Sequence, residues 1–318
     1  MHGLAQAARV VLADCLGVKG NENVLVVIDE PLRAVGEALW AQARELGAEA
    51  VLMEMLPRES NGQEPPAMVA QAMLAAGAVV LATSKSLSHT KARKEANNRG
   101  ARVASMPGIT AEAMARTLQG VDEGLKARAR RYAALLRDAR EVRLTTPAGT
   151  DLTFSIEGRP ATADGGDLSF PGAFGNLPAG EAFVAPVEGT AEGRLVIDGS
   201  MAGIGLLTQP IRIQVEQGTA VRITGGQEAA RLEALLAPHG EKARNIAELG
   251  IGLNEFARIT GLVLEDEKAM GTVHIALGDN STFGGQVEVP SHLDGVILKP
   301  TLWLDGQKVI ENGKLLVE

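Results

Sequence analysis

The chain has 318 residues, 45% of them hydrophobic, and a formal net charge of −8. At roughly 100 to 200 residues per domain, this length predicts two domains with sizeable apolar cores. The negative charge argues against nucleic acid or an anionic membrane as the main partner, and no stretch approaches the ~18 consecutive apolar residues of a membrane span. With one cysteine, Cys15, and no signal-peptide pattern, we expect a soluble cytoplasmic protein without an intrachain disulfide.

Residues 1–140 alternate between helical and strand-like patterns, which predicts an α/β domain. Apolar residues at helical spacing predict a first helix that buries Cys15 and ends at Gly17. Unbroken apolar runs are typical of parallel strands buried on both faces, and Thr110 is a residue type that caps helices. We expect strands at 24–28, 50–53, 78–83 and 102–106, and helices at 31–46, 66–76, 89–98, after Thr110, and at 122–140, where a charged helix would bridge the domains.

From residue 141 the pattern changes to short segments in which apolar and polar residues alternate. The turn at 147–149 predicts a β-hairpin, and Asp305-Gly306 and Asn312-Gly313 predict two tight hairpins near the C-terminus. We expect further strands at 194–198, 211–215 and 221–223, and a helix at 227–236. The sequence therefore predicts an N-terminal parallel-sheet α/β domain, residues 1–140, followed by an α+β metal-binding domain with mostly antiparallel strands, residues 141–318.

Residue types that bind divalent metals gather in a glycine-rich, apolar stretch of the second domain. Imidazole nitrogen together with carboxylate oxygen suits zinc, cobalt, manganese or iron(II). His292 and Asp294 are two residues apart, so their side chains share one face if they lie in a strand. His274 lies in the apolar run 272–278, where an imidazole needs a polar partner, with a satisfied core histidine as the alternative. The candidate ligands here are Glu248, Glu267, His274, His292 and Asp294.

Two further candidates lie outside this stretch. Glu181 follows the turn at 178–180 and precedes an apolar strand, and the local sequence by itself favours an exposed turn residue. His89 follows the strand expected at 78–83, and the carboxyl ends of such strands carry functional groups in α/β domains. A surface histidine near the start of a helix is the alternative for His89.

The chain resembles the aminopeptidase T/aminopeptidase S family of metallopeptidases in five motifs that occur in the family's order: Asn176-Leu-Pro-x-Gly-Glu181-x-Phe183, Glu248-Leu-Gly-Ile-Gly252, Asp266-Glu267-Lys268, His274-Ile-Ala-Leu-Gly278 and His292-Leu-Asp294. The resemblance implies a homodimeric hydrolase that releases N-terminal residues or cleaves a small amide through a metal-activated water. It implies two divalent ions, zinc, cobalt or manganese, with Glu267 as a further ligand or the general base. The ligands that it implies are Glu181, Glu248, His274, His292 and Asp294.

The chain departs from that family at Ser281, which stands where the aminopeptidases carry a catalytic tyrosine. A related branch, the 2,5-dihydroxypyridine 5,6-dioxygenases, uses one iron(II) held by two histidines and a carboxylate. His292 and Asp294 would serve in that branch, with His89 as a base or substrate contact, but Glu248 stands where a histidine is expected. The leading prediction is therefore the hydrolase. A ring-cleaving iron(II) dioxygenase acting on a dihydroxypyridine-like substrate is the alternative, and a non-enzymatic binding protein is the weakest of the three.

Overall fold

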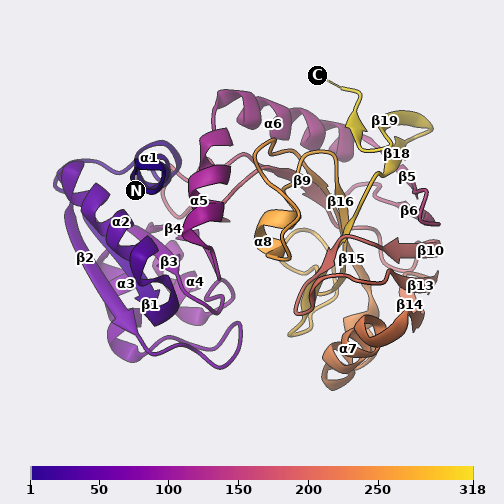
Figure 1. Cartoon of the computed structure of the whole chain (residues 1–318), viewed down its shortest axis with the longest axis horizontal. Helices are drawn as coiled ribbons and strands as arrows, with labels where there is room; N and C mark the ends of the chain where they lie inside the picture. The colour runs from indigo at the N-terminus through magenta and orange to yellow at the C-terminus, as the bar shows by residue number, and fades with distance from the viewer. Residues whose placement is uncertain (1, 318) are drawn as a thin grey trace. The chain divides into compact units, whose positions relative to one another are not determined.

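The computed structural model describes residues 2–317, and the chain divides into two compact units. Figure 1 shows the chain coloured by residue number from the N-terminus to the C-terminus. The first unit runs to Asp122 and adds Gly166–Ala179, and the second comprises Glu123–Gly165 and the chain from Gly180 onwards. The units therefore interleave in sequence, whereas the sequence analysis places a single boundary after residue 140. The charged helix α6, Glu123–Asp138, belongs to the second unit.

The first unit is built on a five-stranded sheet in the order β2-β1-β3-β4-β8, and every neighbouring pair in it is parallel. The strands are β1 Asn23–Asp29, β2 Glu49–Met55, β3 Ala78–Ala82, β4 Arg102–Ser105 and β8 Phe174–Asn176. The helices are α1 His2–Arg9, which continues as a π-helical segment Val10–Cys15, α2 Arg33–Glu45, α3 Ala67–Ala75, α4 Lys91–Asn98 and α5 Ala111–Thr117. The predicted α/β fold is confirmed, including the buried Cys15.

The core of this unit follows from the apolar runs that mark the strands. Leu25 of β1 and Leu81 of β3 pack in one buried cluster with Met73 of α3 and Ala96 of α4. The Thr110 side chain caps α5 as expected, because its hydroxyl oxygen accepts a hydrogen bond from the Ala113 amide at 3.0 Å.

The second unit contains two antiparallel sheets. The eight-stranded sheet has the order β14-β13-β10-β6-β5-β18-β19-β20, and the seven-stranded sheet has the order β12-β11-β17-β16-β15-β9-β7. The first comprises β5 Glu141–Thr145, β6 Asp151–Ser155, β10 Glu192–Ile197, β13 Ile211–Glu216, β14 Thr219–Thr224, β18 Thr301–Leu304, β19 Gln307–Glu311 and β20 Lys314–Leu315. The second comprises β7 Ala161–Asp164, β9 Glu181–Val184, β11 Ser200–Met201, β12 Gly205–Leu206, β15 Ile246–Gly252, β16 Val273–Gly278 and β17 His292–Ile297.

The predicted hairpins of this unit are present: β5 pairs with β6, β18 with β19, and β19 with β20. Two helices accompany α6, namely α7 Gly226–Leu236 and the short α8 Val263–Asp266. Along residues 2–317, no helix is long and apolar enough to cross a membrane.

Candidate metal centre

Four neighbouring strands of the seven-stranded sheet, β9, β15, β16 and β17, present acids and imidazoles on one face. The register explains how large polar side chains fit there, because each lies opposite a small residue on the next strand. Glu181 lies opposite Gly252, His274 opposite Gly250, and His292 opposite Gly278. Ala276 lies between Glu248 on one side and Asp294 on the other. The glycine-rich sequence thus leaves room for a cluster of donors on the surface of a sheet.

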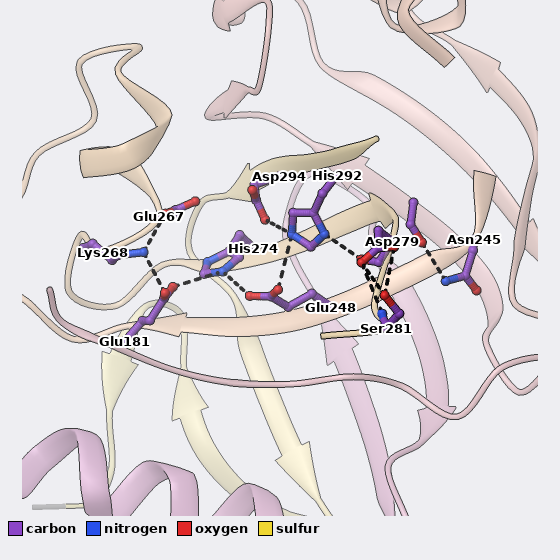
Figure 2. A network of polar contacts seen from close by, with 11 residues as sticks. Glu181, Asn245, Glu248, Glu267, Lys268, His274, Asp279, Ser281, His292 and Asp294 are labelled. Atoms are coloured by element: carbon purple, nitrogen blue, oxygen red, sulfur yellow. Dashed lines mark hydrogen bonds and ion pairs between the residues drawn. The ribbon is translucent and has the colours of Figure 1, made fainter. Parts of the chain in front are cut away.

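Figure 2 shows the cluster, in which three donor sets overlap. The inner set is Glu181, Glu248 and His274, and the outer set is Glu248, His292 and Asp294, so that these two share Glu248. The third set, Glu267, His274 and Asp294, takes one imidazole from the inner set and one carboxylate from the outer set. In the inner set, the His274 Nε2 atom lies 3.3 Å from Glu181 Oε2 and 3.3 Å from Glu248 Oε1. In the outer set, the His292 Nε2 atom lies 3.3 Å from Glu248 Oε2 and 3.3 Å from Asp294 Oδ1. The two oxygens of one carboxylate therefore face two different imidazoles.

His292 is oriented by the loop that precedes β17. Its Nδ1 atom lies 2.7 Å from the backbone carbonyl oxygen of Asp279, to which it donates a hydrogen bond. In a neutral imidazole this donation leaves Nε2 without a proton, so that its lone pair points at the carboxylates of Glu248 and Asp294. A lone pair that faces two carboxylates is stable only if a proton or a metal ion lies between them, and metal-binding histidines are held in this way.

The inner set contains polar atoms that lack a hydrogen-bond partner, although Glu181 Oε2 does face His274 Nε2 at 3.3 Å. Glu181 Oε2 and His274 Nδ1 are buried and have no hydrogen-bond partner. The imidazole of His274 lies directly over Gly250, where an added Cβ would come within 2.0 Å of Nε2. Orphaned buried donors and acceptors are rare because each costs roughly 1 to 3 kcal/mol. Their presence here indicates a cluster shaped for a ligand.

Lys268 closes the inner end of the cluster. Its Nζ atom lies 2.6 Å from Glu181 Oε1 and 2.5 Å from Glu267 Oε1, and its side chain is 1% exposed. The loop after α8 fixes this position: the Lys268 carbonyl accepts a hydrogen bond from the Asn254 amide at 2.8 Å, and the buried Asp266 carboxylate accepts one from the Thr260 amide at 2.7 Å.

The pKa values of the cluster reflect burial opposed by close charges. Burial lowers the pKa of His274, but its contact with Glu248 and the charge of Glu181 outweigh burial and raise it to about 9. Burial also lowers the pKa of His292, yet Asp294 and Glu248 raise it well above the usual value. The pKa of Glu181 rises to about 8, chiefly through burial. The ion-free cluster therefore holds protons that a metal ion would displace.

This donor set fits a divalent metal ion. The cluster holds four carboxylates, and the ammonium of Lys268 contacts only two of them, those of Glu181 and Glu267. With neutral imidazoles, the carboxylates of Glu248 and Asp294 therefore leave an excess of negative charge. Two ligand atoms held about 2.0 to 2.2 Å from one ion lie about 3 Å apart, close to the 3.3 Å separations observed. Buried charge without compensation is costly, and a bound cation compensates it.

The structure brings together six of the residues that the sequence singles out. The set comprises Glu181, Glu248, Glu267, His274, His292 and Asp294. Glu181 is 6% exposed, so the local interpretation as an exposed turn residue is wrong. His89 lies in the first unit, exposed in the turn before α4, and its role as a base or substrate contact stays a prediction. Ser281 is exposed, and its hydroxyl donates to the Asp279 carboxylate.

Two contributors were missed by the sequence analysis. Lys268 was read only as part of a motif, and the Asp279 carbonyl was not considered. A lysine that directly follows three acids, residues 265–267, and precedes an apolar segment was the available signal for the first. No sequence signal identifies a backbone carbonyl as the partner of a histidine 13 residues away.

Comparisons with known proteins give a consistent result. The family model described as NicX, 2,5-dihydroxypyridine 5,6-dioxygenase, matches residues 3–317. A curated 2,5-dihydroxypyridine 5,6-dioxygenase of Pseudomonas putida is 28% identical over 223 residues, which cover 64% of this chain and 62% of that protein. The matched segment thus spans less than two thirds of the relative's length.

Solved structures share the fold. The 2,5-dihydroxypyridine dioxygenase of Pseudomonas putida KT2440 superposes with a TM-score of 0.84 at 23% identity, covering 99% of this chain and 97% of that one. Wild-type AmpT from Thermus thermophilus gives a TM-score of 0.68 at 18% identity, with 99% of each chain covered. At these identities the two structures support the fold, and the sequence matches carry the family.

Proposed function

The chain belongs to the 2,5-dihydroxypyridine 5,6-dioxygenase family, and on that premise we propose that it is a metal-dependent dioxygenase that opens the ring of a hydroxylated pyridine. The observation that carries the proposal is the outer donor set: an imidazole, fixed through its Nδ1 atom, whose Nε2 atom faces two carboxylates at 3.3 Å each. One imidazole with carboxylates is a ligand type that suits iron(II).

The hydrolase favoured by the sequence motifs is a wrong assignment, and so are the aminopeptidase and protease activities that accompanied it. The dioxygenase family model, which spans nearly the whole chain, and the curated dioxygenase relative overturn them. The error has a physical origin: the ligand motifs report a donor cluster on a shared fold, and one donor cluster can serve different reactions. Ser281, which stands in place of the expected tyrosine, was the residue that pointed away from a peptidase.

We place the ion at Glu248, His292 and Asp294. These are the more accessible donors, because the side chains of His292 and Asp294 are 26% and 15% exposed, whereas Lys268 at the other end is 1% exposed. A substrate and dioxygen need such access. The glutamate at position 248 gives one imidazole and two carboxylates in place of the two histidines and one carboxylate that the sequence analysis expects for this branch.

When bound, the metal supplies the redox chemistry that lets dioxygen react with an aromatic ring. The residues of the chain orient the metal ligands and balance their charge. The Asp279 carbonyl holds the His292 ring in one tautomer, and Lys268 restrains the side chains of Glu181 and Glu267. Glu181, with its pKa raised to about 8 chiefly by burial, can hold a proton at Oε2 near neutral pH, which suits the donation of that proton to a substrate oxygen.

Oxygen uptake tests the proposal. Protein purified without oxygen and loaded with iron(II) should consume dioxygen and 2,5-dihydroxypyridine in equal amounts, with loss of the ring's ultraviolet absorbance. Glu248→Gln should abolish uptake, whereas Glu255→Gln, a change at an exposed glutamate, should leave it intact. If iron-loaded protein takes up no dioxygen with any dihydroxypyridine isomer, the proposal is wrong. The homodimer also remains a prediction, which sedimentation would test.

A further inference from the structure

The loop 279–291, which joins β16 to β17, orients a proposed metal ligand through its backbone. The carbonyl oxygen of Asp279 accepts the hydrogen bond from His292 Nδ1 at 2.7 Å, as Figure 2 shows. A carbonyl fixes an imidazole only if the carbonyl is itself fixed, because a hydrogen bond weakens as its distance and angle drift. The inference that follows concerns what fixes it, and it rests on the proposed function in taking His292 as a ligand of the ion.

Asn280 holds the loop together from inside. Its side chain is 0% exposed, although the next two residues of the loop are exposed. Its Oδ1 atom accepts a hydrogen bond from the Val287 amide at 2.9 Å, and its own backbone amide donates to the Val287 carbonyl at 3.1 Å. The Asn280 side chain fills the space beside Gly285, where an added Cβ would come within 1.9 Å of Asn280 Cγ. Asn280 therefore joins the two sides of the loop.

Glu188, which follows β9, ties this loop to a distant segment of the second unit. Its Oε1 atom accepts a hydrogen bond from Asn280 Nδ2 at 2.9 Å and another from the Gln286 amide at 2.7 Å. Its Oε2 atom pairs with Arg159, whose guanidinium also donates to the Gly284 carbonyl. Burial acts to raise the pKa of the Glu188 carboxyl, but the hydrogen bonds and the charge of Arg159 outweigh it and lower the pKa. The acceptor is therefore charged at neutral pH, and such hydrogen bonds are strong.

The same loop contacts the imidazole a second time. The ring of Phe283 lies edge-on to the ring of His292, with centroids 5.9 Å apart and an interplanar angle of 85°. The Phe283 amide donates to the Asn280 carbonyl at 3.3 Å, so the position of this ring also depends on Asn280. His292 is thus held by a carbonyl at Nδ1 and by an aromatic ring, and the loop that Glu188 ties down supplies both.

We propose that Glu188 is a positioning residue for the metal centre: through Asn280 it holds the Asp279 carbonyl against His292 and so directs the Nε2 lone pair of that imidazole at the ion. The Asp279 carbonyl and the Asn280 amide belong to one planar peptide unit, so a contact that fixes Asn280 also fixes the carbonyl. Partners that orient a ligand from outside change metal affinity by about 10- to 100-fold. Glu188 acts one contact further away, so the lower end of that range applies.

Cobalt(II) binding tests the proposal without reference to catalysis. Glu188→Ala removes the acceptor and should raise the cobalt(II) dissociation constant about tenfold. In cobalt-loaded protein, the hyperfine-shifted NMR signal of the His292 Nδ1 proton, assigned by its loss in His292→Gln, should broaden in Glu188→Ala through faster exchange with water. Glu188→Gln keeps a side-chain oxygen for Asn280 and should match the wild type in both measurements. Glu288→Ala, at an exposed glutamate of the same loop, is the matched control.

The outcomes separate this inference from the proposed function. A folded Glu188→Ala protein with wild-type affinity and an unchanged His292 signal would overturn the inference and leave the metal centre standing. Equal losses in Glu188→Gln and Glu188→Ala would also overturn it, because they would assign the effect to the ion pair with Arg159. A wild type that binds no cobalt would overturn the metal centre, and the inference with it.

A second variant approaches the same link if Glu188→Ala does not fold. Gly285→Ala places a Cβ against the Asn280 side chain, and the backbone of Gly285 is not left-handed. Displacement of that side chain from Glu188 should give the same loss of cobalt affinity and the same broadening of the His292 signal. Wild-type behaviour of this variant would overturn the inference as well.

Discussion

Replacing Gly250 with alanine tests how the imidazole of His274 is held. Gly250 lies opposite His274 in the pairing of β15 with β16, and the ring covers it. An added Cβ would lie 2.0 Å from Nε2 and 2.1 Å from Cε1, where ordinary contacts begin at 3.4 Å. The backbone of Gly250 is not left-handed, so alanine adds no backbone strain, and the destabilisation in the folded state arises from the clash with the ring.

The magnitude follows from the contacts that the ring would lose. The imidazole must move by about 1.4 Å, and overpacking of this kind costs roughly 1 to 3 kcal/mol. Its hydrogen bond to the charged Glu248 would be lost too, at about 1.5 to 3 kcal/mol. Alanine restricts the unfolded chain more than glycine does, and this lower entropy of the unfolded state stabilises the variant by roughly 0.4 to 1 kcal/mol. We therefore expect Gly250→Ala to lower the free energy of unfolding by about 1.5 to 5.5 kcal/mol.

Urea unfolding of metal-free protein, followed by circular dichroism, measures this change. Gly20→Ala is the matched control, because a Cβ there meets nothing closer than 3.8 Å, and its effect should stay within about 0.5 kcal/mol. Metal affinity should also fall, by about 10- to 100-fold, since His274 contacts Glu248, a proposed ligand.

The reasoning would be refuted by a Gly250→Ala protein that unfolds at the same urea concentration as Gly20→Ala and binds metal as tightly as the wild type. That result would mean that the His274 ring does not cover Gly250.

Three further predictions concern charge, pH and local structure. Glu248→Gln alters the carboxylate shared by both donor sets, so elemental analysis should find less than about a tenth of the wild-type metal, with Glu255→Gln unchanged. The pKa of His274 is raised from 6.5 to about 9 in the ion-free fold, so the stability it contributes is fully present below pH 6.5 and lost as the pH rises through 9. The thermal midpoint of metal-free protein should fall across this window, and a flat profile would contradict the assignment. Thr110→Ala should lower the free energy of unfolding by about 1 kcal/mol through loss of the α5 cap, while Thr110→Ser should retain most of it; equal losses in both would argue against the cap.

The sequence by itself determined features that depend on near neighbours along the chain. An apolar run predicts β1, Asn312-Gly313 predicts the β19–β20 hairpin, and the two-residue spacing of His292 and Asp294 places them on one face of β17. These predictions hold because helix and strand periods and turn conformations are local properties. The donor residues were likewise recognised from their types and motifs, which did not decide the reaction.

Only the tertiary structure decided which residues meet across the sheet. Glu181 reads locally as an exposed turn residue, but the pairing of β9 with β15 buries it, and Lys268, 87 residues further along, contacts its carboxylate. The strand Phe174–Asn176 pairs with β4 in the parallel sheet, although at three residues it is too short to show a strand pattern in the sequence. Strand register and the room that Gly250 leaves for His274 arise from pairing between distant segments. No local period encodes such pairing, because its free energy comes from contacts that exist only once the chain has folded.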